Sequence, residues 1–194
     1  MKRRGLVRAR GIAGACGLAL LVESACHTPA ERARPAGEPF IALERDFQGF
    51  QSWTKVRLEG RPASGSVHAA DDAHEFINRL PPAGSRAFPV GTIVVKTMKS
   101  AKAPADAGAS TGGGTDIFAM VKRGAGYNEK GTPGWEWFEL RPRADQSLGI
   151  VWRGVNPPDG EGYGREVKGG CNGCHQEAIA NDYVQARALT LAEI

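Results

Sequence analysis

The sequence predicts an α+β fold, in which a mainly antiparallel β-sheet is flanked by helices. Several short runs are rich in β-branched and aromatic residues, and loops rich in glycine and proline separate them, which is typical of antiparallel strands. The chain has 194 residues, of which 41% are hydrophobic and 24% charged, so it suits one globular domain. No apolar run reaches the roughly 18 residues of a membrane-spanning helix.

Residues 46–194 are expected to form the folded domain. The run Gly91–Met98 is rich in β-branched residues and too short for a buried helix, so we interpret it as a strand. The same pattern predicts four more strands, over His74–Asn78, Asp116–Lys122, Trp135–Arg141 and Gly149–Val155. Helices are expected at the two ends, over Asp46–Leu58 and Cys174–Leu189. Residues 26–45 are rich in alanine, proline and charge and are expected to form a flexible tether.

Residues 1–25 have the three parts of an export signal. A cationic start precedes an apolar core, Ile12–Val22, which is followed by the small residues Ser24 and Ala25. We therefore expect a signal peptide, and a mature protein that is periplasmic or otherwise exported. The same 25 residues carry the whole net charge of +4, so the rest of the chain is balanced and no nucleic-acid partner is expected.

Cys26 directly follows this segment and suits a lipoprotein, whose N-terminal cysteine takes a lipid anchor. Glu23 fits such a signal poorly, because an apolar residue usually stands at that position. A protein anchored to the membrane through Cys26 and a freely secreted protein therefore both stay open.

The strongest chemical signal is the run Cys171-Asn172-Gly173-Cys174-His175. Two thiols at this spacing can meet the two vinyl groups on one edge of a porphyrin, and the adjoining imidazole can reach the iron from the same side. The run therefore predicts a covalently attached haem c. Cys171 and Cys174 would form the thioethers, and His175 would be the proximal iron ligand.

Other uses of this run fit less well. A thioredoxin-like dithiol stands early in its fold, whereas only 19 residues follow His175. A structural zinc ion or an iron–sulfur cluster needs more ligands, and the mature chain has no second pair of cysteines. A disulfide or a redox pair stays open as the main alternative.

No methionine follows the run, so a sixth iron ligand would have to come from earlier in the chain. The candidates are Met98, Met120, His68 and His74. With none of them bound, the distal site is open. An open iron can bind a small molecule, whereas a closed one mainly passes electrons.

Five segments resemble the cytochrome P-460 family in order and spacing: Phe88–Lys96, Ala119–Lys122, Gly134–Trp137, Cys171–His175 and Asp182–Val184. The resemblance covers most of the chain from Asp46 onward. It implies an antiparallel sheet with packed helices, a homodimer, and a haem c with an open distal site. Some members oxidise hydroxylamine and pass the electrons to another cytochrome. Their relatives, the beta-type cytochromes c prime, bind nitric oxide or carbon monoxide, and a simple electron carrier is a third reading.

Lys96 separates these activities. In the hydroxylamine-oxidising members, a lysine at the matching position is bonded to the porphyrin. On a strand, Lys96 shares a face with Val94 and Met98, so it can point toward a packed haem, where desolvation would make its amine nucleophilic. From the residues alone, a solvent-exposed lysine on an edge strand is the more common case. The resemblance favours the haem-facing role.

Three further residues are candidates for the distal side. Hydroxylamine oxidation releases protons, so a carboxylate near the iron would serve as a base, and Glu136 and Glu166 are the candidates, although most such acids are simply solvated. Phe118 shares a strand face with Met120 and would instead form an apolar cap that favours a neutral diatomic gas. Asn172 stands where many relatives have an aromatic or small apolar residue, and we expect it to affect packing more than ligation.

Overall fold

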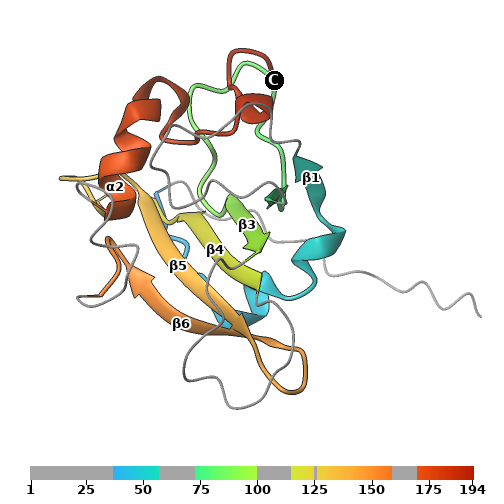
Figure 1. Ribbon diagram of the computed structural model, residues 1–194. Coiled ribbons are helices and arrows are strands. Elements are labelled where there is room, and N and C mark those ends of the chain that lie inside the picture. Colours follow the sequence, from blue (N-terminus) through green and yellow to red (C-terminus); the bar gives the residue numbers. More distant parts are fainter. Residues whose placement is uncertain (1–36, 57–72, 100–114, 125, 159–169) are drawn as a thin grey trace, which may run out of the picture. The chain divides into compact units, whose positions relative to one another are not determined.

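The computed structural model describes residues 37–56, 73–99, 115–124, 126–158 and 170–194 (Figure 1). All of them belong to one compact unit, Pro35–Ile194. The predicted signal peptide, Cys26, His68 and Glu166 lie outside the described residues. None of the helices in the described ranges is long and apolar enough to cross a membrane.

The described strands form one antiparallel sheet in which each strand pairs with its neighbour in sequence. This arrangement confirms the predicted fold class. All five expected strands are present, with ends that differ by a few residues at most, and a short first strand is added. In sheet order, the six strands are β1 (Thr54–Val56), β2 (His74–Ile77), β3 (Ile93–Lys99), β4 (Thr115–Lys122), β5 (Trp135–Pro142) and β6 (Leu148–Gly154).

The predicted helix over Asp46–Leu58 was wrong. Two short 3₁₀ helices, η1 (Glu44–Phe47) and η2 (Phe50–Ser52), take its place, and β1 follows them. Gly49 lies between the two helices with a φ of 67°, a left-handed conformation that glycine adopts easily and that ends a helix.

The predicted tether ends before residue 45. The backbone N–H of Phe40 donates to the carbonyl of Arg123 at 2.7 Å, and Ala42 is fully buried. The last residues of the expected tether are therefore part of the folded unit.

The predicted C-terminal helix is broken into pieces. The haem-attachment run lies in α2 (Gly170–His175), which continues into the 3₁₀ helix η3 (Gln176–Asn181), and a third piece, η4 (Arg187–Leu189), stands apart. Asp182 and Tyr183 have φ values of 49° and 70°. Two successive left-handed residues cannot continue a right-handed helix, so the chain turns at this point.

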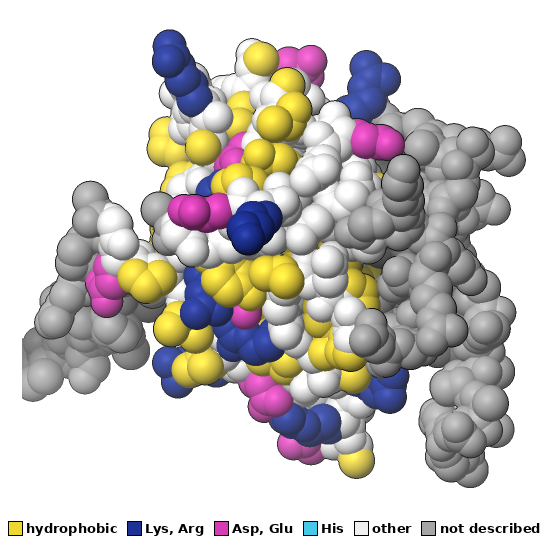
Figure 2. Space-filling view, turned by 90° about the vertical axis from the view of Figure 1, so that its left-hand side faces the viewer, with side chains coloured by type: hydrophobic (Ala, Val, Ile, Leu, Met, Phe, Trp, Pro, Cys, Tyr) yellow, Lys and Arg dark blue, Asp and Glu magenta, His cyan; other side chains and the backbone are white. Residues whose placement is uncertain are grey.

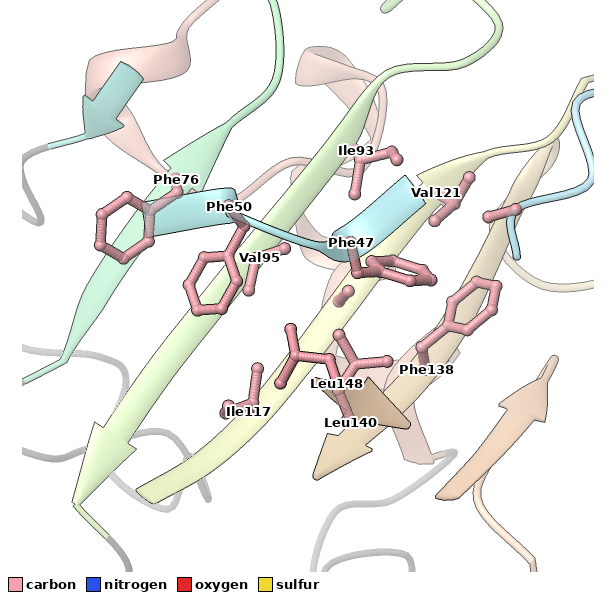
Figure 3. Packing of buried hydrophobic residues seen from close by; sticks show 12 residues of the cluster. Phe47, Phe50, Phe76, Ile93, Val95, Ile117, Val121, Phe138, Leu140 and Leu148 are labelled. Carbon is pink, nitrogen blue, oxygen red and sulfur yellow. The ribbon is translucent and has the colours of Figure 1, made fainter. Parts of the chain in front are cut away.

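One face of the sheet, here called the closed face, carries an apolar core (Figure 3). Phe47 of η1 and Phe50 of η2 pack on it, with ring centroids 5.1 Å from Phe138 and 5.3 Å from Phe76. The other buried members of the cluster are Ala42, Ile93, Val95, Ile117, Ala119, Val121, Leu140 and Leu148.

The opposite face of the sheet, here called the site face, packs against the C-terminal segment. Because side chains alternate along a strand, the same strands supply both faces. From the sheet the site face takes Val56, Ile77, Val94, Met120, Trp135, Trp137 and Trp152, and the C-terminal segment adds Val184, Ala186, Leu189 and Leu191. Figure 1 shows α2 beside one end of β5.

Candidate haem site

Both cysteines of the attachment run are carried by α2. Cys171 and Cys174 are three residues apart on this helix, a spacing that brings side chains to one side of it. Both thiols are free and partly buried. Burial raises the pKa of Cys171 to about 12, so its thiol is neutral until a reaction partner or a metal lowers that value.

The His175 imidazole is held from two directions. Its Nδ1 lies 2.7 Å from the carbonyl oxygen of Tyr183, and its ring centroid lies 4.4 Å from that of Trp137, with the planes tilted by 50°. If Nδ1 donates to the carbonyl, the lone pair is left on Nε2. Burial lowers the pKa of His175 to about 4, so the imidazole is neutral at pH 7, which is the form that binds a metal.

The Tyr183 carbonyl is fixed by the residue before it. One carboxylate oxygen of Asp182 accepts from Lys122 Nζ at 2.7 Å, and the other accepts from the backbone N–H of Phe88 at 2.9 Å. The Asp182 carbonyl accepts from Trp135 Nε1 at 2.8 Å. These bonds tie the left-handed turn to the sheet and so orient the acceptor that faces His175.

Lys96 lies in the middle of β3 on the site face. Its Nζ is 3.6 Å from Glu75 Oε1 on the neighbouring strand, and the two side chains are 19% and 12% exposed. Burial is the main cause of the lowered pKa of His175, and the positive charge of Lys96 adds to it. Lys96 therefore lies on the same sheet face as Trp137, which packs against His175, and its haem-facing role stays a prediction.

A row of paired residues crosses the site face through Lys96. Lys96 is paired with Glu75 on one side and with Phe118 on the other, and Phe118 is paired in turn with Glu139 on β5. Phe118 therefore separates the lysine from a second carboxylate. Glu139 accepts from Trp152 Nε1 at 2.9 Å through Oε2, and from the exposed Arg141 at 3.2 Å through Oε1.

Glu139 lies on the site face and was not among the residues predicted from the sequence. The same strand alternation that was applied to Lys96 would have found it, because Glu139 is two residues after Trp137 and shares its face. Glu136, which was expected as a catalytic base, lies on the opposite face for the same reason.

Glu136 is engaged in a buried ion cluster away from Lys96 and His175. Its side chain is 2% exposed and accepts two hydrogen bonds of 2.8 Å from Arg153 and one of 3.2 Å from Arg123. The structure therefore does not bring Glu136 to the candidate site. Its position corrects the expectation that Glu136 is a base beside the iron.

The described candidates for a sixth iron ligand also lie on different faces of the sheet. Met98 and Met120 are buried; Met120 belongs to the site-face cluster, and Met98 shares the Lys96 side of β3. His74 is exposed and pairs with Thr97, so it lies on the other side of the sheet. Of the two methionines and the histidine, only the methionines lie on the face of the attachment run.

The residues of this site fit a haem. Two thiols stand on one helix, and the adjoining imidazole is neutral, desolvated and bonded at Nδ1. Aromatic and apolar side chains of the site face surround them, which suits a planar apolar macrocycle. Charged groups on the face shown in Figure 2 are mixed in sign among the described residues.

Comparison with known families matches residues 47–186 to cytochrome P460. No curated protein and no solved structure gives a significant match. The family match covers well over half of the chain and contains the attachment run, Lys96 and Glu139. The protein therefore belongs to the cytochrome P460 family and is a haem cytochrome of that kind.

Proposed function

We propose that this protein carries one haem c and oxidises hydroxylamine or a related small nitrogen compound, passing the electrons to another cytochrome. The observation that carries the proposal is the row Lys96, Phe118 and Glu139 on the face of the sheet that also meets His175. It combines the lysine typical of the hydroxylamine-oxidising branch with a carboxylate that can take protons.

The attachment residues have the chemistry for a covalent haem. Cys171 and Cys174 supply the two thioether sulfurs, and His175 supplies a neutral nitrogen for the iron. When bound, the haem supplies a redox-active iron that takes electrons from the substrate. The remaining steps, which orient the substrate and remove its protons, fall to side chains of this chain.

Lys96 is proposed as the residue that is bonded to the porphyrin, as in the hydroxylamine-oxidising relatives. Its side chain is 19% exposed, and its Nζ lies 3.6 Å from the Glu75 carboxylate. Burial raises the pKa of Glu75, and the charge of Lys96 opposes this rise.

Glu139 is proposed as the base that accepts protons as the substrate is oxidised. The Trp152 indole orients one of its oxygens, and the other contacts Arg141, whose side chain is 70% exposed. A proton accepted inside the site can therefore leave toward solvent along the Arg141 side. A positioned general base of this kind contributes roughly 10²- to 10⁴-fold to a rate.

A second function is favoured by Phe118. This ring stands between Lys96 and Glu139 in the row, so it can shield the distal side with an apolar surface. Such a surface favours a neutral diatomic ligand over a polar substrate. If Lys96 is not bonded to the porphyrin, we propose that the protein binds nitric oxide or carbon monoxide instead.

Mass spectrometry of haem peptides decides between these functions. A peptide that joins Lys96 to the porphyrin, together with consumption of hydroxylamine and reduction of an added electron acceptor, supports the first proposal. Lys96→Leu should abolish the joined peptide, and Lys55→Leu, at an exposed lysine of β1, is the matched control. A free Lys96 peptide with tight nitric oxide binding supports the second function. A low-spin ferric haem that ignores nitric oxide would contradict both and indicate Met98 or Met120 as a closing ligand.

Export is proposed from residues 1–25 alone. The mass of the mature N-terminus after expression in an export-competent host tests it. Cleavage before Cys26 with an added diacylglycerol would indicate a lipoprotein, and cleavage without it a secreted protein. A haem protein that keeps the full N-terminus would contradict the proposal.

A further inference from the structure

Asn172 occupies the first variable position of the attachment run, and its side-chain amide makes several hydrogen bonds. Its Oδ1 accepts hydrogen bonds from Asn128 Nδ2 at 2.8 Å, from Thr132 Oγ1 at 2.8 Å and from Trp137 Nε1 at 3.0 Å. Its Nδ2 donates to Asn128 Oδ1 at 3.1 Å. An amide oxygen has two lone pairs, so three donors saturate it. The expectation that Asn172 serves packing does not account for this network.

The loop formed by residues 126–134, here called the docking loop, is shaped to receive Asn172. Asn128 adopts a φ of 53°, which asparagine tolerates better than most residues, and its Nδ2 also donates to the Trp135 carbonyl at 3.0 Å. A Cβ at Gly131 would collide with the Asn172 and Asn128 amides. Glycine at that position lets the loop backbone approach α2 closely.

Trp137 connects the docking loop network to His175. The indole is 5% exposed; its N–H is bonded to Asn172, and its ring lies 4.4 Å from the imidazole. A buried indole whose N–H has a fixed acceptor keeps one ring orientation, because any other leaves that donor unsatisfied. The orientation of the Trp137 ring, against which the His175 imidazole packs, is thus set by Asn172.

We propose that Asn172 is a positioning residue for His175. It acts through Trp137, whose ring face restricts the imidazole, while the Tyr183 carbonyl restricts its Nδ1. The iron–histidine bond therefore depends on a neutral side chain that does not touch the iron ligand. This inference rests on the haem c part of the proposed function and is independent of the reaction.

The test uses the purified ferrous haem protein and its nitric oxide adduct. Resonance Raman spectra report the iron–histidine stretching band, and optical spectra report the ratio of five- to six-coordinate nitric oxide adduct, which rises when the histidine bond weakens. Asn172→Ala should broaden the band and raise this ratio about fivefold, the factor that one neutral hydrogen bond is worth. Trp137→Phe keeps the bonds of Asn172 to the docking loop but removes the indole N–H, and it should shift both readouts in the same direction.

Gln176→Ala is the matched control. Gln176 Nε2 donates to the Gly131 carbonyl at 3.2 Å, so this variant weakens the contact between the docking loop and the helical segment without touching Trp137. It should leave the band and the ratio as in the wild type. The double variant Asn172→Ala/Trp137→Phe should change them no more than the larger single effect, because both residues act along one path.

The inference is overturned if Trp137→Phe leaves both readouts unchanged, since Asn172 would then act only by anchoring α2. It is also overturned if Gln176→Ala changes them as much as Asn172→Ala does. Should Asn172→Ala fail to fold, Trp137→Phe and Gln176→Ala decide the matter alone. A failure of the haem c assignment is visible earlier, because the wild type would then release its haem in acidic acetone or show no iron–histidine band.

Discussion

The two faces of the sheet are built from the same strands but differ in how their charged side chains are paired. On the closed face, the buried Glu136 accepts three hydrogen bonds from Arg153 and Arg123. On the site face, Lys96 and Glu75 stand 3.6 Å apart in a loose pair. Glu139, on the same face, is bonded to a neutral indole and to an exposed arginine.

We therefore expect substitutions on the closed face to change stability, and substitutions on the site face to change reactivity. Removing a buried charge that has several strong partners costs much free energy, and such a group is unsuited to exchanging protons. Glu139 is bonded to the neutral Trp152 indole and to the largely exposed Arg141, so removing its charge is expected to cost less stability than at Glu136. Glu136 and Glu139 are three residues apart on β5, and strand alternation places them on opposite faces of the sheet.

The largest expected effect is on the site face. His175→Ala removes the imidazole while both cysteines remain, so we expect a covalently held haem whose high-spin, histidine-ligated spectrum is lost completely. The closed-face core is untouched, so the circular dichroism of the sheet should persist. Optical and resonance Raman spectra measure the change. An unchanged spectrum would refute His175 as the iron ligand.

The converse substitution on the closed face should affect stability and spare the site. Phe138→Ala opens a cavity beside Phe47 and should lower the free energy of unfolding by about 3 to 5 kcal/mol. Urea denaturation of the haem protein measures this loss. The spectrum of the folded variant should match the wild type, and a large spectral change would show that the two faces are not independent.

Glu139→Gln tests the chemical role of the site face. The amide keeps the shape and can still accept from Trp152, but it does not take a proton, so hydroxylamine turnover should fall about 100-fold. The free energy of unfolding should change little. Steady-state kinetics with an artificial electron acceptor measure the rate, and wild-type turnover in this variant would remove Glu139 as the base.

Glu136→Gln is the partner experiment on the same strand. Loss of this buried charge leaves Arg153 and Arg123 without their shared counterion, so we expect a loss of about 3 kcal/mol in the free energy of unfolding. Hydroxylamine turnover at a temperature where the variant is folded should stay at the wild-type level. A turnover loss as large as that of Glu139→Gln would reverse the assignment of roles.

The smallest expected effect concerns pH and Glu75. Burial raises the pKa of Glu75 above its ordinary value of 4.5, although Lys96 opposes the rise. The folded protein then holds this proton more tightly than the unfolded chain, so this group's contribution to stability is greatest at low pH and falls as pH rises through the raised pKa. Glu75→Gln should flatten this part of the stability profile in urea titrations. An unaltered slope would show that Glu75 does not titrate in this way.

Much of the sheet could be predicted from the sequence, because its strands are marked by β-branched runs. β1 was missed because its three residues are too few to show a period and follow residues that favour a helix. The C-terminal helix was expected to be too long, since the left-handed turn at Asp182 and Tyr183 is held by contacts with distant residues such as Lys122 and Trp135.

The site was predictable where the chemistry is local and not where it depends on folding. The thiols and imidazole of the attachment run lie within five consecutive residues. Strand alternation allowed a haem-facing Lys96, but only the family resemblance favoured it over an exposed lysine. The roles of Asn172 and Asp182 were hidden, because their partners are many residues away in the chain. Glu139 could have been predicted, because it is two residues after Trp137 on the same strand and so shares its face.

The order of the strands has a consequence for how the haem is acquired. Every described strand pairs with its neighbour in sequence, so the sheet can assemble one strand after another along the chain. In contrast, α2 has six residues, too few to be helical without a docking partner. We therefore expect α2 to become helical only after the sheet against which it packs has formed, so that its two thiols would stay accessible to haem until then.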